Sequence, residues 1–294
     1  MKSSDLVIVL APVVSGYRSS YLTRKGRSVQ PFLAAPYQLL EAISSSIPVY
    51  VTTDHIKDHL LTHANYSLFQ DFFEDILRSG KSPIIFGGDH SISIPATTAL
   101  AKVYPSVQTV RLDRDLDHGS AGISIRGKEM VEDCRSDNFD EAGMGYLLHH
   151  YPTVAITHIG SPVGPGHQGN LLDDSLEDTI GSIIQDLDGR IDVITCNDLN
   201  SKKPRINMPC HLSIDIDCYK DVNAKQFGYT PLDGCMTHKH MQALIPRIIA
   251  SGYIKSIDIT ELTDNRDHRA LEHAGYAFDL ILDSIGRYNS GKRI

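Results

Sequence analysis

Carboxylate side chains and one histidine follow three apolar segments of the chain, and together they have the composition of a metal centre. They are His90, Asp113, Asp115, Asp117, Asp215 and Asp217. The aspartates of each run stand at every second position, so in an extended chain they are expected to project to one side. Crowded carboxylates repel each other unless their pKa values rise or a cation neutralises them. Five carboxylates and a histidine suit two divalent ions about 3.5–4 Å apart, and hard oxygen ligands favour Mn²⁺ or Mg²⁺ over Zn²⁺.

The same segments have simpler interpretations. A DxDxD run is typical of an EF-hand calcium loop, but that loop has glycine at its sixth position and glutamate at its twelfth, where this chain has His118 and Ser124. A solvated acidic turn is an alternative for residues 113–117, and a plain glycine turn is one for Gly87-Gly88. The occurrence of all three segments directly after strand candidates favours a metal centre.

The elements that must position these residues alternate between strands and helices. Strands are predicted at 6–13, 48–52, 83–86, 107–112, 154–159, 192–195, 211–216 and 254–259, and helices at 66–77, 94–103, 176–187, 241–249 and 272–285. This alternation predicts a parallel sheet with helices on both faces. Because no repeat or linker interrupts the pattern, we expect one α/β domain over residues 1–294. Ligands of such sheets bind at the carboxyl ends of the strands, where the acidic segments are expected to meet.

Composition narrows the class of partner. The formal net charge is -8 and no basic run occurs, which argues against nucleic-acid binding. The apolar run at the start of the chain is too short for a membrane span and a poor signal peptide. Five scattered cysteines without a CxxC pair argue against a disulfide framework and a structural zinc site, so a reducing, cytoplasmic compartment is expected. They are Cys134, Cys196, Cys210, Cys218 and Cys235.

Several motifs resemble those of the ureohydrolase family, which includes arginases, agmatinases and formiminoglutamases. Residues 87–91 resemble its GGDHS motif, 112–117 its DAHxD motif, 213–217 with Asp221 its SxDxD segment, 230–234 its TPxxGG segment, and 258–261 its late strand that ends in glutamate. These motifs follow the family's order from about residue 84 to residue 261, which is most of the chain.

The resemblance implies a three-layer α/β/α sandwich on a parallel sheet of about eight strands. It also implies hydrolysis of a linear C–N bond in a cationic guanidino compound, with release of urea and an amine, by two Mn²⁺ ions that activate water. By position, His90, Asp113, Asp117 and Asp215 would hold one ion, and Asp113, Asp115, Asp215 and Asp217 the other. Glu261 would receive the guanidinium group and Asp117 would relay a proton. A homo-oligomer, trimeric or hexameric, is also implied.

The chain departs from the family pattern at the second acidic segment. Asp115 stands where the family has histidine, and the added charge predicts weaker Lewis acidity, slower turnover or loss of the second ion. Arg114 replaces an alanine and offsets this charge, although strand alternation would aim it at the other face. His118 directly follows the run and is a candidate proton shuttle. These departures leave two alternatives open: a degenerate, non-catalytic homologue that binds a ligand or partner, and a hydrolase of a formimino compound.

Overall fold

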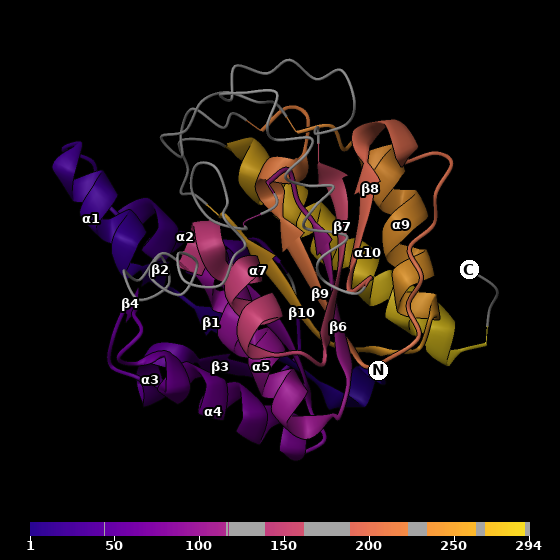
Figure 1. Cartoon of the computed structure of the whole chain (residues 1–294), viewed down its shortest axis with the longest axis horizontal. Coiled ribbons are helices and arrows are strands. Elements are labelled where there is room, and N and C mark those ends of the chain that lie inside the picture. Colours follow the sequence, from indigo (N-terminus) through magenta and orange to yellow (C-terminus); the bar gives the residue numbers. More distant parts are fainter. Residues whose placement is uncertain are drawn as a thin grey trace.

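A parallel sheet forms the centre of the molecule (Figure 1). The computed structural model describes residues 1–43, 45–115, 117, 139–161, 189–222, 234–262 and 268–291. In these residues eight strands form one all-parallel sheet in the order β3-β1-β5-β10-β9-β6-β7-β8. The strands are β1 (Leu6–Ala11), β3 (Val49–Val51), β5 (Ser82–Gly87), β6 (Val107–Leu112), β7 (Val154–Ser161), β8 (Ile191–Thr195), β9 (Cys210–Asp215) and β10 (Ile254–Thr260). The predicted parallel α/β architecture is confirmed.

The first predicted strand, 6–13, is longer than the observed one. β1 ends at Ala11, before Pro12, and the chain then forms β2 (Val14–Ser15), which pairs with β4 (Leu60–Leu61) in a separate parallel pair. The carbonyl oxygens of Ala11 and Val13 instead accept the N–H groups of Gly88 and Asp89, at 3.1 and 3.2 Å. The start of the chain therefore supports the turn that follows β5.

Helices lie on both sides of the sheet (Figure 1). The observed helices are α1 (Gly16–Arg24), α2 (Gln30–Ala42), α3 (Thr52–His55), α4 (Tyr66–Arg78), α5 (Ser93–Val103), α7 (Phe139–His150), α9 (His238–Ala250) and α10 (His268–Asn289). Four predicted helices correspond to α4, α5, α9 and α10, whereas the one predicted at 176–187 lies outside the described residues. Helices α1, α2, α3 and α7 were not predicted; α3 has only four residues, and α2 contains Pro31 and Pro36.

Alternate strand residues enter two separate apolar cores. Leu6, Ile8 and Leu10 of β1 pack in one core with residues of α2, α9 and α10. Val7 and Val9 enter the other, which includes residues of α4, α5 and α7. This two-sided burial explains why β1 reads as a continuous apolar run.

The strand order brings the chemistry-bearing segments together. β5, β10, β9 and β6 are consecutive in the sheet, and all run in the same direction. The pairings Thr260↔Asp215 and Leu112↔Ile214 bring the last residues of β10, β9 and β6 level with one another. Segments that are far apart in the sequence therefore meet along the carboxyl-terminal ends of the strands, which form one edge of the sheet.

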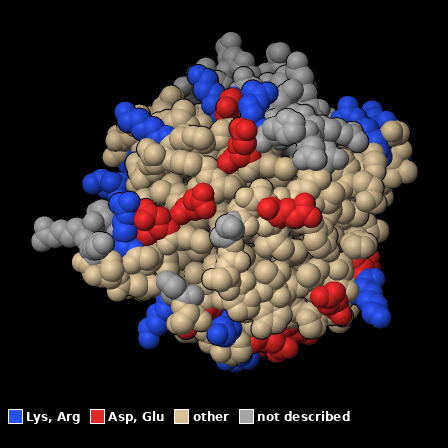
Figure 2. Space-filling model, turned by 180° about the vertical axis from the view of Figure 1, so that it is seen from behind, with Lys and Arg blue, Asp and Glu red and all other residues tan. Residues whose placement is uncertain are grey.

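Charged side chains are dispersed over the surface that Figure 2 shows. On the described part of this face, Lys and Arg side chains are interspersed with Asp and Glu side chains and do not form one continuous stripe. None of the helices in the described ranges is long and apolar enough to cross a membrane.

Candidate metal centre

The turn after β5 positions His90. A Cβ atom on Gly88 would lie 2.2 Å from the carbonyl oxygen of Val13, so this close approach requires glycine. The Asp89 carboxylate accepts the N–H of Ser91 at 3.1 Å and the N–H of Ser15 at 2.6 Å. Asp89 therefore holds the turn, and the following His90 side chain is buried at the sheet edge.

The His90 ring has one nitrogen fixed and the other directed at carboxylates. Its Nε2 atom lies 2.8 Å from Oγ of Ser213, within hydrogen-bond distance. Its Nδ1 atom lies 2.9 Å from Oδ2 of Asp215, 3.2 Å from Oδ2 of Asp113 and 3.4 Å from Oδ2 of Asp117. A metal-ligating histidine has this arrangement, with a second partner that fixes the orientation of the ring.

Two donor groups form at the ends of β6 and β9. Asp113 Oδ1 accepts the N–H of Asp115 at 2.7 Å, and Asp215 Oδ1 accepts the N–H of Asp217 at 2.9 Å, so both strands end in the same kind of aspartate turn. The first donor group is His90, Asp113 and Asp117, and the second is Asp113, Asp215 and Asp217. Within each group the ligand atoms lie within 4.8 Å of one another.

The acidic run 113–117 is not an extended chain. Asp117 has a positive φ of 48°. Asp113 and Asp117 meet in the first donor group but Asp115 does not, so the predicted projection of all three aspartates to one side is wrong. Asp115 has a half-exposed side chain and lies outside both donor groups; its Oδ2 atom lies 2.6 Å from Nη2 of Arg114. Its assignment as a metal ligand stays a prediction. His118 lies outside the described residues.

Arg111 contributes a buried cation that the sequence analysis did not identify. Its side chain is fully buried, and its Nη2 atom contacts the carboxylates of both Asp113 and Asp117 and lies 2.8 Å from Nδ1 of His90. These three residues are the first donor group. The available signal was a charged residue inside an apolar strand, two positions before Asp113 and hence on the same face of the strand.

Arg114 supplies a second cation on the other side of the cluster. Its buried Nη2 atom lies 2.9 Å from Oδ2 of Asp217. The expectation from strand alternation, which aimed this side chain at the other face, is wrong because β6 ends at Leu112 and the chain turns. The expectation that Arg114 offsets the charge of Asp115 agrees with the observed ion pair.

Glu261, at the end of β10, already binds a guanidinium group of the protein itself. Both of its carboxylate oxygens lie 2.5 Å from Nη1 of Arg18 in α1, and Oε1 accepts the N–H of His90 at 3.1 Å. The Arg18 guanidinium also lies over the ring of Phe32, 5.2 Å from its centroid. Glu261 has a positive φ of 56° and, with Asp117, is one of two such non-glycine residues in the described ranges. Sparsely populated backbone conformations of this kind cluster at functional sites.

Burial and mutual repulsion act on the carboxylates of the cluster. Burial, with Asp115 and Asp113 nearby, raises the pKa of Asp217 to about 6, although Arg114 opposes this rise. Burial likewise raises the pKa of Glu261 to about 7 against the effect of Arg18. For Asp113, burial is outweighed by Arg111 and His90, which hold the pKa of this carboxyl well below its usual range. Burial therefore disfavours the ionised form of these carboxylates, and the neighbouring cations favour it.

The donor atoms fit a divalent cation. The two donor groups differ in whether their atoms already have a partner within the protein. The Oδ1 atom of Asp217 is buried and has no hydrogen-bond partner, which leaves a lone pair in the second donor group for a cation. In the first donor group, Arg111 contacts the atoms that an ion would use. Oxygen ligands with one imidazole favour Mn²⁺ or Mg²⁺.

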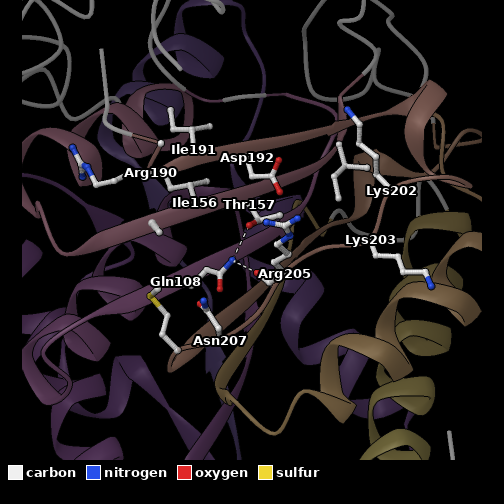
Figure 3. Close-up of a pocket in the computed structure, with 14 residues that line it drawn as sticks. Gln108, Ile156, Thr157, Arg190, Ile191, Asp192, Lys202, Lys203, Arg205 and Asn207 are labelled. Atoms are coloured by element: carbon white, nitrogen blue, oxygen red, sulfur yellow. Dashed lines mark hydrogen bonds between the residues drawn. The ribbon is translucent and has the colours of Figure 1, made fainter. Parts of the chain in front are cut away.

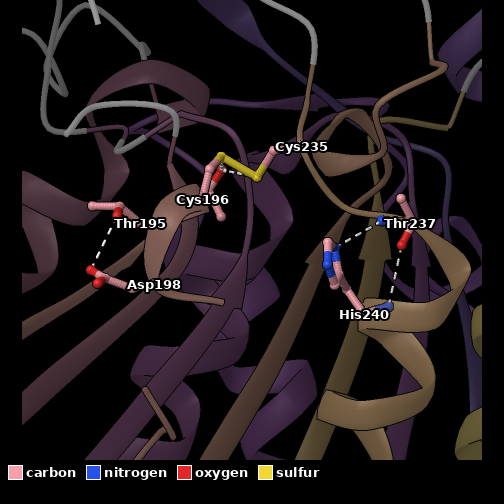
Figure 4. The surroundings of a disulfide bond; sticks show 7 residues. Thr195, Cys196, Asp198, Cys235, Thr237 and His240 are labelled. Atoms are coloured by element: carbon pink, nitrogen blue, oxygen red, sulfur yellow. Dashed lines mark hydrogen bonds between the residues drawn. A yellow bond between two sulfur atoms is a disulfide. The ribbon is translucent and has the colours of Figure 1, made fainter. Parts of the chain in front are cut away.

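A disulfide links two cysteines near this edge of the sheet, which corrects the expectation that the cysteines are unpaired. Cys196, after β8, is bonded to Cys235, with the two Cα atoms 5.9 Å apart (Figure 4). Thr237, two residues further on, caps α9 by accepting the N–H of His240. The sequence did not reveal the bond because 39 positions separate the cysteines, and only the fold brings them together. This bond removes the reason to expect a reducing compartment, and a cytoplasmic location stays a prediction.

A cavity of about 580 Å³ lies elsewhere in the molecule (Figure 3). It is lined by residues at the starts of β6, β7 and β8, among them Gln108, Thr157 and Asp192, together with Arg190 and Arg205. The donor groups lie at the opposite ends of these strands. This cavity is therefore separate from the candidate metal centre.

Sequence comparisons relate the chain to one family of enzymes. The model of the arginase family matches residues 29–122. The hepatic arginase of Aquarana catesbeiana is 24% identical over 229 residues, which are 74% of this chain and 70% of that protein. An agmatinase of Sodalis glossinidius is 26% identical over 218 residues and 72% of this chain, and the match spans only 62% of the agmatinase.

Structural comparisons give the same fold. The arginase of Bacillus subtilis superposes with a TM-score of 0.59 at 15% identity and covers 95% of this chain and 97% of its own. The agmatine ureohydrolase of Thermoplasma volcanium gives a TM-score of 0.63 at 15% identity, covering 98% of this chain and 92% of its own. The formiminoglutamase of Trypanosoma cruzi with Mn²⁺ gives a TM-score of 0.65 at 15% identity, covering 97% of this chain and 93% of its own.

Proposed function

We propose that this chain, which is similar to the arginase family of ureohydrolases, is a metal-dependent hydrolase of a linear C–N bond in a guanidino compound. The observation that carries this proposal is the pair of buried donor groups at the strand ends, which combine one imidazole with four carboxylates. Mn²⁺ is the proposed metal, since oxygen-rich donor sets of this kind suit it.

The residues of the cluster have distinct proposed roles. His90, Asp113, Asp117, Asp215 and Asp217 hold the metal, with Asp115 as a further candidate ligand. When bound, the metal supplies a nucleophile at neutral pH by lowering the pKa of water, and it polarises the bond that breaks. Asp117 relays a proton to the leaving amine, and His118 is the proposed shuttle to solvent.

Glu261 is the proposed acceptor of the substrate. Its two oxygens already bind the Arg18 guanidinium, so this carboxylate has the geometry to hold a planar cation by charge-assisted hydrogen bonds. A guanidino substrate that uses Glu261 must first displace Arg18. The relatives include an arginase, agmatinases and a formiminoglutamase, and the tail of the substrate is not assigned.

One assay tests this proposal. The purified chain is loaded with Mn²⁺ and desalted, its metal content is measured, and urea release is followed over a panel of guanidino compounds. Bound metal with urea release supports the proposal, and release of formamide or ammonia in place of urea points to a formimino substrate. Asp215→Asn is the matched variant, because it removes a donor with little change in shape, and it is expected to lose both metal and activity.

A second function, a non-catalytic binding protein, is favoured by the arginines. Arg111, Arg114 and Arg18 contact the carboxylates that would bind the metal and the substrate. A chain that binds no Mn²⁺ and releases no product from any compound supports this second function. Assembly into a homo-oligomer stays a prediction for either function, and size-exclusion chromatography with light scattering tests it.

A further inference from the structure

We propose that Arg111 takes the place of one divalent cation, so that this chain forms a one-metal centre at Asp113, Asp215 and Asp217. The inference rests on the proposed function in one respect, that the cluster binds metal at all. It changes the number of ions, their position and the residues that neutralise the carboxylates.

Arg111 lies against all three residues of the first donor group. Its Nη2 atom contacts a carboxylate oxygen of Asp113 and one of Asp117, and it lies 2.8 Å from Nδ1 of His90. Each residue of the first donor group, His90, Asp113 and Asp117, therefore has a possible ligand atom in contact with Arg111. A guanidinium nitrogen and a metal ion cannot share this position, so the first donor group is closed to metal while Arg111 stays.

Burial makes Arg111 hard to displace. The side chain is fully buried on β6, in the middle of the sheet, and a guanidinium that left the carboxylates would need another site for its charge. Removing one partner from a buried ion pair is strongly destabilising, because it leaves the other charge buried without compensation. Metal entering the first donor group would have to compensate for this loss.

The second donor group differs, because it keeps an unused donor. Oδ1 of Asp217 is buried without a hydrogen-bond partner, whereas Oδ2 of the same carboxylate lies 2.9 Å from Nη2 of Arg114. Arg114 therefore binds only one of the two oxygens. A buried carboxylate oxygen without a partner is costly, and a cation between Asp113, Asp215 and Asp217 would satisfy it.

The two arginines also reduce the number of ions that the cluster needs. Arg111 contacts Asp113 and Asp117, and Arg114 lies 2.9 Å from Asp217, so two positive charges of the protein already face the carboxylates. Two divalent ions would add four positive charges beside these guanidinium groups, whereas one ion adds two. A single ion is therefore consistent with the added arginines.

Metal counting with a spectroscopic readout tests the inference. Wild-type protein and the Arg111→Met variant are loaded with Mn²⁺, desalted and analysed for metal content and by electron paramagnetic resonance. We expect one ion with the signal of isolated Mn²⁺ in the wild type, and two ions with a spin-coupled signal in the variant. Two ions in the wild type, or no additional ion in a folded Arg111→Met protein, would overturn the inference. Metal on neither protein would instead remove the proposed function.

Two further variants keep the test decisive if Arg111→Met does not fold. Asp117→Asn removes a donor of the first group only, and Asp217→Asn removes a donor of the second group only. We expect the first variant to keep its single ion and the second to lose it. The opposite result, with metal lost on Asp117→Asn and kept on Asp217→Asn, contradicts the inference without affecting the proposed function. Arg287→Leu, which removes an exposed arginine that pairs with Asp283, is the control for loss of positive charge.

Discussion

Nη2 of Arg111 lies 2.8 Å from Nδ1 of His90, the ring nitrogen that faces the carboxylates of the cluster. The other ring nitrogen lies within hydrogen-bond distance of Ser213, so His90 has the orientation of a metal ligand although its inner nitrogen faces a guanidinium. Arginase-family architecture is therefore combined here with cations that belong to the protein.

Arg18→Met is expected to lower the free energy of unfolding by about 3 kcal/mol, because it leaves the Glu261 carboxylate buried without its cation. Methylguanidine at millimolar concentration should restore part of this loss in the variant and very little in the wild type, as measured by thermal unfolding. The double variant Arg18→Met/Glu261→Gln is the control, and its loss should be clearly smaller than the sum of the two single losses. Additive losses would show that the two side chains are not coupled.

Gly88→Ala is expected to destabilise the chain by about 1–3 kcal/mol, because the new Cβ atom would meet the carbonyl oxygen of Val13 at 2.2 Å. The turn that carries His90 should shift with it, so bound metal should also decrease. Gly275→Ala in α10 is the matched control: a Cβ atom there meets nothing within 4 Å, and alanine in a helix should stabilise by roughly 0.5–1 kcal/mol. Urea unfolding curves of both variants provide the comparison. Equal effects would contradict the close approach at Gly88.

The disulfide predicts a redox-dependent stability. Replacing both Cys196 and Cys235 by serine is expected to lower the free energy of unfolding by about 2–4 kcal/mol, since a cross-link over 39 positions restricts the unfolded chain. Dithiothreitol should lower the stability of the wild type by a similar amount and leave the variant unchanged. If the reductant affects both proteins equally, the loss does not come from this bond.

Stability should also fall in mildly acidic solution because of His273. Burial lowers the pKa of His273; Asp221 and Glu272 oppose this effect and His238 adds to it. Since the folded pKa lies below the usual value of about 6.5, the unfolded chain takes up the proton first as the pH falls. The contribution of His273 is therefore complete above about pH 6.5 and is lost as the pH falls through its folded pKa. When unfolding is measured at several pH values, the free energy of unfolding should fall less steeply with decreasing pH in His273→Gln than in the wild type. Equal slopes would contradict a contribution from His273.

The sheet and the acidic segments could be predicted from the sequence because both are local patterns. The segment 83–86 is a continuous apolar run that lies within β5, and the predicted strands 107–112 and 254–259 coincide with β6 and nearly with β10. The contact between Arg18 and Glu261 could not be predicted in this way, because 243 positions separate the two residues. Alternation also failed for Arg114 and Asp115, since it holds only while a strand continues, and β6 ends before both residues.

Crystals grown with Mn²⁺ and measured at the manganese absorption edge would locate each bound ion among the carboxylates. We expect a single anomalous peak per chain, between the carboxylates of Asp113, Asp215 and Asp217, with the Arg111 guanidinium still in contact with Asp117. Two peaks per chain, or one peak between His90 and Asp117 with Arg111 displaced, would contradict this expectation.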